Sequence, residues 1–355
     1  MSKKFWLVGL LVLIISLSPG VVGSAKSAAT QTIVWKFQSV LVKGASWTTI
    51  IEENAFREIE KRTNGGLKIE LYGSGGLGIA GSAILDAVST GVLEAAEMWG
   101  GHVMGTWPIA SMAEYPGVLP FDVKMKQAVA KALFPYWEKS LIGRNVVLWY
   151  ADFVEPRNIF TKKKAETMAG FKGMKIRAAG VADVIQALGV DATAVPTEYN
   201  EVYTALERGI LDGHITTNTA TLSARLHEQE KYMYETNLGG FHGYFIINKR
   251  AWEALPAEYQ KVVREVADDF IAVRWREDMT KSIDQARKDI LGAGLVYMNA
   301  QNPKLLDEMR SGIVRSCNPE LEKMVKKAGP VGTEMLTVIR DVVKKHGYQW
   351  APKIP

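Results

Sequence analysis

Strand and helix patterns alternate along the first part of the chain, and this alternation restricts the fold more than any other feature. Residues Ile33–Val40 alternate apolar and polar side chains as a half-buried strand does, and Leu67–Tyr72 repeats the pattern. Between them, Ser46–Thr63 places its large apolar side chains on one helical face. A second helix is expected at Gly81–Thr90 and a third strand at Val92–Trp99. Strands separated by helices at this spacing predict a parallel sheet covered by helices, which is an α/β fold.

A second strand–helix series begins further along the chain. Strand patterns at Lys175–Ala178, Thr193–Val195 and Asp212–Thr217 alternate with helix patterns at Val181–Leu188 and Glu198–Arg208. The chain has 355 residues, and a single hydrophobic core stops growing at roughly 250–300 residues. Two series in a chain of this length therefore predict two α/β lobes.

One helix pattern is unusually long. From Pro256 to about Ile290 the sequence is helical almost without interruption. At 1.5 Å per residue such a helix is about 50 Å long, which exceeds the width of a small lobe. We therefore expect it to run across both lobes. Two further helices, Pro303–Lys327 and Thr333–His346, are expected to close the chain.

The N-terminus is typical of an export signal and not of the fold. Lys3 and Lys4 precede the apolar run Phe5–Leu17, and the small residues Gly23–Ala25 follow it. This order predicts a cleavable secretory signal peptide over residues 1–25 and a periplasmic mature protein. The apolar run is shorter than the roughly 20 residues that a membrane span needs. An uncleaved anchor is the alternative.

Several functional classes have no support in the sequence. Cys317 is the single cysteine, and the five histidines lack the spacing of a zinc site, so we expect no metal and no cofactor. Basic residues are scattered in a chain of net charge +5, so nucleic acid is not an expected partner. The chain has neither a G-x-S-x-G elbow nor a Walker loop, and we expect no enzymatic activity.

One motif leaves an enzymatic alternative open. Residues Gly73–Gly78 read GSGGLG and match G-x-G-x-x-G between a strand and a helix, as in dinucleotide-binding proteins. A chain with 32 glycines matches so short a pattern readily. A turn that joins a strand to a helix is the simpler interpretation. The alternative is a secreted oxidoreductase that binds a nicotinamide or flavin nucleotide at this loop.

The segment 173–217 reads GMKIRAAGVADVIQALGVDATAVPTEYNEVYTALERGILDGHITT. Together with LKIELYGSGGLG upstream and INKRAWEALPAEYQKVV downstream, it resembles the DctP-type extracytoplasmic solute receptors of tripartite ATP-independent periplasmic (TRAP) transporters. The resemblance implies a periplasmic binding protein fold, with two α/β lobes joined by hinge strands, a ligand cleft between them and a long helix that bridges both. It places residues 31–154 with 243–282 in one lobe, and 155–242 with 283–355 in the other.

The resemblance also implies which residues hold the ligand. In this family the arginine of the KIR strand binds the substrate carboxylate, and here that residue is Arg177. The planar fork of donors on a guanidinium matches a carboxylate, which supports the assignment. Arg157, in the segment PRNIF, matches a second anion-contacting arginine, with a structural salt bridge as the alternative. Four further contact positions carried over from the family are Trp99, Thr216, Phe241 and His242.

The function implied by the resemblance is capture and delivery, without chemistry on the ligand. A monomeric periplasmic receptor binds an organic acid and delivers it to the membrane subunits of a TRAP permease. The segment DGHITTNTA departs from the known subtypes, and the nearby aromatic residues favour a monocarboxylate with a bulky or aromatic remainder. The alternative within binding proteins is the receptor of an ATP-driven importer, which shares the cleft but lacks the segment from KIR to DG.

Overall fold

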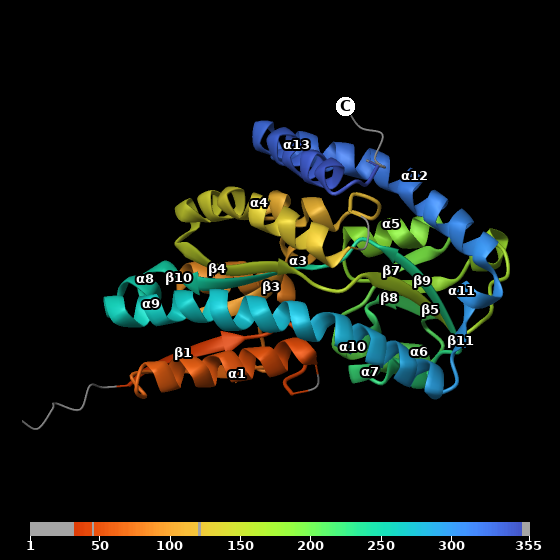
Figure 1. Cartoon of the computed structure of the whole chain (residues 1–355). Coiled ribbons are helices and arrows are strands. Elements are labelled where there is room, and N and C mark those ends of the chain that lie inside the picture. Colours follow the sequence, from red (N-terminus) through yellow and green to blue (C-terminus); the bar gives the residue numbers. More distant parts are fainter. Residues whose placement is uncertain (1–31, 45, 120–121, 350–355) are drawn as a thin grey trace, which may run out of the picture. The chain divides into compact units, whose positions relative to one another are not determined.

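The computed structural model describes residues 32–44, 46–119 and 122–349, and two β-sheets organise them (Figure 1). The signal peptide predicted for residues 1–25 lies outside the described residues. The first sheet has the strand order β2-β1-β3-β10-β4. Its strands are β1 (Ile33–Gln38), β2 (Leu67–Tyr72), β3 (Ala95–Trp99), β4 (Val146–Phe153) and β10 (His242–Asn248).

The first sheet is parallel on one side only. Strand β1 pairs in parallel with β2 and β3, as the alternating pattern predicts. Strand β10 returns from far along the chain and pairs antiparallel with both β3 and β4, so the sheet is mixed. The helices of this part are α1 (Trp47–Arg62), the 3-10 turn η1 (Gly81–Ala83), α2 (Ile84–Thr90) and α4 (Val123–Leu141). Ser46 caps α1, and Gly91 ends α2 with a left-handed φ of 82°.

The second sheet has the order β11-β9-β5-β8-β6-β7. Its strands are β5 (Arg157–Thr161), β6 (Lys175–Ala178), β7 (Thr193–Pro196), β8 (Gly213–Thr216), β9 (Tyr232–Leu238) and β11 (Val296–Tyr297). Strand β6 pairs in parallel with β7 and β8, whereas β5 runs antiparallel to β8 and β9. The helices that connect these strands are α5 (Val181–Gly189), η5 (Tyr199–Glu201), α6 (Val202–Glu207), α7 (Asn218–Ser223) and η6 (Leu226–Glu228).

The chain passes between the two sheets at short connections. Strand β4 of the first sheet is followed by β5 of the second, and β9 of the second is followed by β10 of the first. Two sheets joined in this way confirm the predicted fold class. The residue limits predicted for the two lobes stay a prediction.

The long helix predicted from Pro256 onward is continuous but not uniform. It consists of α9 (Ala257–Val266), a π-helical turn (Ala267–Ile271) and α10 (Ala272–Gly292). Helix α10 contacts α1, which covers the first sheet, and α7, which follows a strand of the second sheet (Figure 1). The helix therefore bridges both parts of the fold, as predicted.

The chain closes with two long helices, α12 (Pro303–Ala328) and α13 (Pro330–Lys345), which pack on α5 and α4, respectively. A Cβ atom at Gly312 of α12 would lie 2.1 Å from the carbonyl oxygen of Gly189 in α5. Helix α12 can therefore approach α5 this closely only because residue 312 is a glycine. Cys317 is a buried thiol in α12. None of the described helices combines the length and apolar character of a membrane span. The short elements are α3 (Gly100–Val103), η2 (Pro108–Glu114), η3 (Ile142–Arg144), η4 (Met168–Phe171), α8 (Lys249–Glu253) and α11 (Met298–Gln301).

Candidate functional site

A cavity of about 710 Å³ lies at the carboxyl ends of strands from both sheets. One side is formed by residues at or after the ends of β1, β2 and β3: Gln38, Val40, Ser74, Gly75, Gly78, Ile79, Ala80, Gly81, Ser82, Ile84, Gly101 and His102. The other side is formed by residues at the ends of β6 and β7: Arg177, Ala178, Ala179, Pro196, Thr197, Glu198, Tyr199, Asn200 and Glu201. Ligands of α/β sheets bind outside the carboxyl ends of the strands, and the cavity occupies that place.

Arg177 borders this cavity as a buried cation without a carboxylate partner. Its side chain extends from β6, and the residue is 4% exposed. Its Nε donates to the carbonyl oxygen of Thr197 at 3.1 Å, and its Nη1 lies 3.5 Å from that of Ile215. Within the described residues no carboxylate lies within salt-bridge distance of it. Burial lowers the pKa of Arg177, but a guanidinium remains charged at neutral pH.

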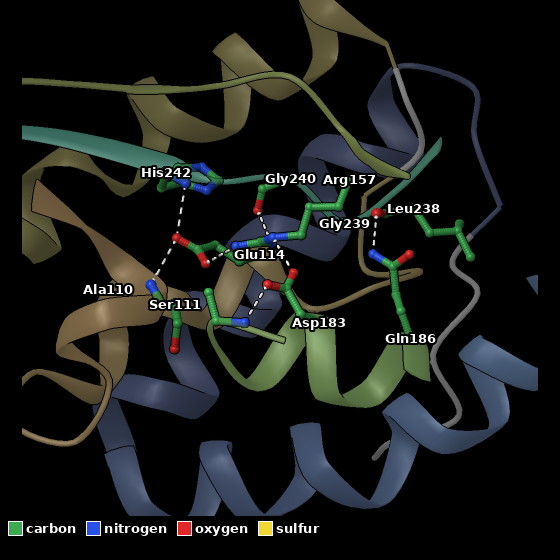
Figure 2. Close-up of polar contacts among 12 residues, drawn as sticks. Ala110, Ser111, Glu114, Arg157, Asp183, Gln186, Leu238, Gly239, Gly240 and His242 are labelled. Atoms are coloured by element: carbon green, nitrogen blue, oxygen red, sulfur yellow. Dashed lines mark hydrogen bonds and ion pairs between the residues drawn. The ribbon is translucent and has the colours of Figure 1, made fainter. Parts of the chain in front are cut away.

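Arg157 has the opposite surroundings (Figure 2). Its Nη2 lies 3.2 Å from Oε2 of Glu114, and its Nε lies 2.7 Å from Oδ1 of Asp183, with all three side chains fully buried. Its Nη1 donates to the carbonyl oxygen of Gly240 at 2.7 Å, and its guanidinium lies 3.4 Å from the ring centroid of Phe241. Two carboxylates therefore surround the Arg157 cation, and Arg157 is not among the residues that line the cavity.

Glu114 connects this ion pair to the first sheet. Its Oε1 accepts a hydrogen bond from the backbone N–H group of His242 at 2.9 Å (Figure 2) and one from that of Gly101 at 3.2 Å. Burial raises the pKa of Glu114 to about 7, although the positive charge of Arg157 acts in the opposite direction. Burial and the Arg157 charge therefore act in opposite directions on the protonation of Glu114.

Two of the other predicted contact residues, Trp99 and Phe241, pack against each other beside the cavity-lining His102. The rings of Trp99 and Phe241 lie 4.2 Å apart, and Phe241 in turn lies against Arg157. The Trp99 ring also lies 5.7 Å from that of His102, which does line the cavity. Trp99 and Phe241 are buried, and neither is among the cavity-lining residues.

Thr216 and His242 are also buried and lie outside the cavity lining. Neither ring nitrogen of His242 has a hydrogen-bond partner within the described residues. Burial, reinforced by the nearby Lys126 and Arg157, lowers the pKa of His242 to about 3, so this imidazole is neutral. Of the six residues predicted from the sequence, the structure places only Arg177 on the cavity wall.

The fold agrees with what comparisons with known proteins show. The family described as bacterial extracellular solute-binding protein, family 7 (DctP) matches residues 43–317. The chain belongs to this family. The predicted resemblance is confirmed, and the protein is of an extracellular, solute-binding kind.

A named relative and two solved structures are similar to this chain over most of their length. The 2,3-diketo-L-gulonate-binding periplasmic protein YiaO of Escherichia coli is 23% identical over 295 residues, which cover 80% of this chain and 84% of YiaO. DctP7 of Bordetella pertussis, an extracytoplasmic solute receptor binding pyroglutamic acid, matches with a TM-score of 0.79 at 21% identity. That match covers 87% of this chain and 100% of DctP7. A marine metagenome TRAP solute binding protein specific for aromatic acid ligands matches with a TM-score of 0.76 at 23% identity, covering 88% of this chain and 99% of that protein.

The structure also places on the cavity wall residues that the sequence did not single out. Gln38 is the last residue of β1, and His102 lies three residues after the end of β3. Both follow strands whose carboxyl ends meet at one edge of a sheet, and that position is the signal that points to them. The glycine-rich loop Gly73–Gly78 lies there too and lines the cavity with Ser74, Gly75 and Gly78.

The glycine-rich loop has the geometry of a turn. Gly75 and Gly78 have φ values of 72° and 71°, which glycine adopts at no steric cost. The first helical element after the loop is the 3-10 turn η1, which begins only at Gly81. A dinucleotide fingerprint needs the glycine turn to open directly into a helix, whose N-terminus holds the pyrophosphate. This loop therefore fits the interpretation as a turn. Within residues 32–44, 46–119 and 122–349, no three His, Cys, Asp or Glu side chains group as a metal site.

Proposed function

We propose that this family 7 protein is the periplasmic receptor of a TRAP transporter and binds a small organic acid through Arg177. The observation that carries the proposal is a buried guanidinium, without a carboxylate partner in the described residues, on the wall of a cavity of about 710 Å³. A buried charge is costly unless it is paired, and the carboxylate of a ligand supplies the missing partner. The volume lies within the range of roughly 300–1,000 Å³ that is usual for small-molecule sites.

The acids bound by the similar proteins support a carboxylate ligand. YiaO is named for 2,3-diketo-L-gulonate, DctP7 for pyroglutamic acid, and the metagenome protein was crystallised with metahydroxyphenylacetate. All three compounds carry a single carboxylate. A monocarboxylate with a bulky or aromatic remainder is compatible with one uncompensated cation and with the size of the cavity.

Arg157 has a weaker case as a ligand contact than Arg177. Its charge is already matched by Glu114 and Asp183, so a ligand carboxylate there would compete with two fixed carboxylates. We propose that Arg157 holds the second sheet against η2 and thereby shapes the floor of the site. Contacts of the ligand with Arg157, Trp99, Thr216, Phe241 and His242 stay a prediction.

The position of the cavity between the two sheets supports a binding step that is coupled to closure. The ligand contacts residues from both sides, so it stabilises the arrangement in which they are close, by as much as its affinity for that arrangement exceeds its affinity for an open one. The closed receptor then docks on its membrane permease. We propose a monomer, exported by the signal peptide at residues 1–25, that does no chemistry on the ligand.

The test of the binding site is the substitution Arg177→Ala. A thermal-shift screen of organic acids first identifies a ligand, and isothermal titration calorimetry then measures its Kd. Removing the partner of a buried carboxylate costs about 3–5 kcal/mol, which corresponds to a loss of a few hundred- to several thousand-fold in affinity. Arg177→Lys should lose most of this affinity too, because an ammonium lacks the planar fork of donors.

The matched control is Arg208→Ala, which removes an exposed arginine of the same sheet region and should leave Kd unchanged. A loss of tenfold or less for Arg177→Ala would remove Arg177 from the site. Transport is tested with the receptor and its permease in proteoliposomes. Uptake that needs an ion gradient and no ATP supports a TRAP permease, and uptake that needs ATP supports the importer of the other class.

A further inference from the structure

The cavity has a second polar group that lacks a partner, the imidazole of His102. No hydrogen bond joins this ring to another described residue, and its Nδ1 is shielded from solvent. The ring is held in place by Trp99, whose ring lies 5.7 Å away, and by the backbone at Gly81. A Cβ atom at Gly81 would lie 2.7 Å from Nδ1, so the imidazole fits only because that residue has no side chain.

Gln38 supplies a matching acceptor on the same wall. Its Nε2 donates to the carbonyl oxygen of Ile79 at 2.9 Å, which fixes the orientation of the amide, because the flipped amide would place two oxygens in contact. Its Oε1 is buried and has no hydrogen-bond partner in the described residues. A buried acceptor without a donor costs free energy. Gln38 and His102 both pack against residues 79–81, so they lie on one side of the cavity.

The charges around this side exclude two kinds of ligand group. Burial, and then the positive charges of Arg177 and Arg157, lower the pKa of His102 to about 4, and the same field disfavours an ammonium group on a ligand. A second carboxylate would face the acceptor oxygen of Gln38, and the exposed side chains of Glu198 and Glu201 on the opposite wall of the cavity would repel it. A neutral group that donates a hydrogen bond remains.

We infer that the ligand is a monocarboxylate that also carries a neutral hydrogen-bond donor, a hydroxyl or an amide N–H, and that Gln38 and His102 select for this group. The inference rests on the proposed function, since it takes the carboxylate to be held by Arg177. An amide or lactam matches both residues, because its N–H donates to Oε1 of Gln38 while its carbonyl oxygen accepts from the neutral imidazole.

Five carboxylates test this selection by calorimetry. Pyroglutamate, cyclopentanecarboxylate and proline share a five-membered ring and differ in carrying a lactam, no donor or a cationic amine. Metahydroxyphenylacetate and phenylacetate form a second pair for an aromatic ligand. In at least one series the acid with the neutral donor should bind at least about tenfold tighter than the acid without it, and proline should bind more weakly than pyroglutamate.

Variants then locate the selection. In Gln38→Leu the ligand's donor no longer meets a buried acceptor, and in His102→Phe the ligand's carbonyl oxygen loses its donor, so in each variant the preference should fall to about threefold or less. Gln301→Leu is the control, since it removes an exposed amide that does not line the cavity and should leave the preference unchanged. Circular dichroism and thermal unfolding show whether each variant is folded. If one of the two variants does not fold, the preference measured in the other still tests the inference.

The outcomes separate this inference from the proposed function. Equal affinity of the acids with and without a donor overturns the inference and leaves the role of Arg177 intact, as does binding of none of the five while other acids still bind through Arg177. An unchanged preference in both variants also overturns it. Unchanged affinity in Arg177→Ala overturns the proposed function itself.

Discussion

Two buried arginines illustrate how the surroundings of a side chain decide what it can do. Arg157 is enclosed by Glu114 and Asp183, so its charge is used within the protein. Arg177 has only backbone carbonyl oxygens as hydrogen-bond partners in the described residues, so its charge is available to a ligand. Arg157 therefore stabilises the fold, whereas the unpaired charge of Arg177 lowers the stability of the ligand-free protein. Binding of a carboxylate supplies the partner that Arg177 lacks.

A buried acid, Glu52 of α1, gives a prediction at this scale. Its carboxyl group is fully buried beside that of Glu97. Burial, and then the neighbouring Glu97, raise the pKa of Glu52 well above its ordinary value. As pH rises above that ordinary value, the unfolded chain releases this proton while the folded chain retains it, so stability falls.

The substitution Glu52→Gln keeps the shape of the side chain and removes the carboxyl group that titrates. We expect the variant to be more stable than the wild type by about 1–2 kcal/mol at pH 8, and by clearly less at pH 5. Urea unfolding at the two pH values measures both differences. Glu138→Gln, an exposed position on α4, is the control and should change neither value. A gain that is larger at pH 5 than at pH 8 would contradict the assignment.

At the scale of elements, the Arg157 side chain joins three segments that are distant in sequence. It extends from β5, contacts Asp183 of α5, and contacts Glu114 at the end of η2 (Figure 2). Asp183 is fixed in turn, since its Oδ2 accepts from the backbone N–H of Ala179 at 2.9 Å, which places the end of β6 beside the start of α5. The ion pairs thereby position the strand that carries Arg177.

We expect Arg157→Ala and Arg177→Ala to affect stability in different ways. Arg157→Ala leaves two buried carboxylates without their cation and should lower the free energy of unfolding by about 3–5 kcal/mol. Arg177→Ala removes an unpaired buried cation and should leave the ligand-free protein at least as stable as the wild type. Urea unfolding without ligand compares the two, and Arg157→Lys should restore part of the loss. Equal losses in the two alanine variants would show that the roles are not divided in this way.

Elements with strong local periodicity were predictable from the sequence. The predicted limits of β2 and β6 coincide with the observed ones, and α1 ends within one residue of its prediction. Strands β5 and β9 were missed. Every residue of β5 is buried, so the strand shows no alternation, and β9 is held by pairing with strands remote in sequence. The antiparallel insertion of β10 into the first sheet likewise depends on contacts that no local pattern encodes.

The candidate site was predictable only where a motif names a residue. Arg177 came from the KIR strand, and the structure places it on the cavity wall. The partners of Arg157 were not foreseen, because Glu114 is 43 residues away from Arg157 in the sequence and Asp183 lies on another helix. Gln38 and His102 were not foreseen either, since each is an isolated polar residue whose role depends on which strand ends meet.

At the scale of the whole molecule, buried carboxyl groups recur where the two sheets meet. Glu155 lies in the connection between β4 and β5 and contacts helices next to both sheets. Nε1 of Trp47, at the start of α1, donates to its carboxyl group at 3.2 Å, and the backbone N–H of Thr219 in α7 donates to it at 3.2 Å. The Thr219 hydroxyl bonds to the same carboxyl group. Burial raises the pKa of Glu155 as it does that of Glu114. Contacts between the two sheets thus depend on groups that titrate.

These groups predict how stability varies with pH. Burial raises the pKa of Glu114 to about 7 and that of Asp152 to about 6, so from pH 8 downward the folded chain takes up protons before the unfolded chain does, and stability rises. His102 and His242 have pKa values lowered to about 4 and about 3, so below about pH 6.5 the unfolded chain takes up protons that the folded chain does not, and stability falls.

We therefore expect the melting temperature of the ligand-free protein to be highest between about pH 5 and pH 7 and to decrease toward pH 8. Each kcal/mol changes the melting temperature of a chain of this size by about 2–4 °C, which differential scanning fluorimetry resolves. Glu114→Gln should flatten the decrease between pH 6 and pH 8, since it removes the group whose proton uptake falls in that interval, whereas Glu138→Gln should not. A melting temperature that still rises from pH 7 to pH 8 would contradict this expectation. It would mean that Arg157 keeps Glu114 ionised in the folded protein, so that the contact between η2 and β5 is an ion pair throughout this pH range.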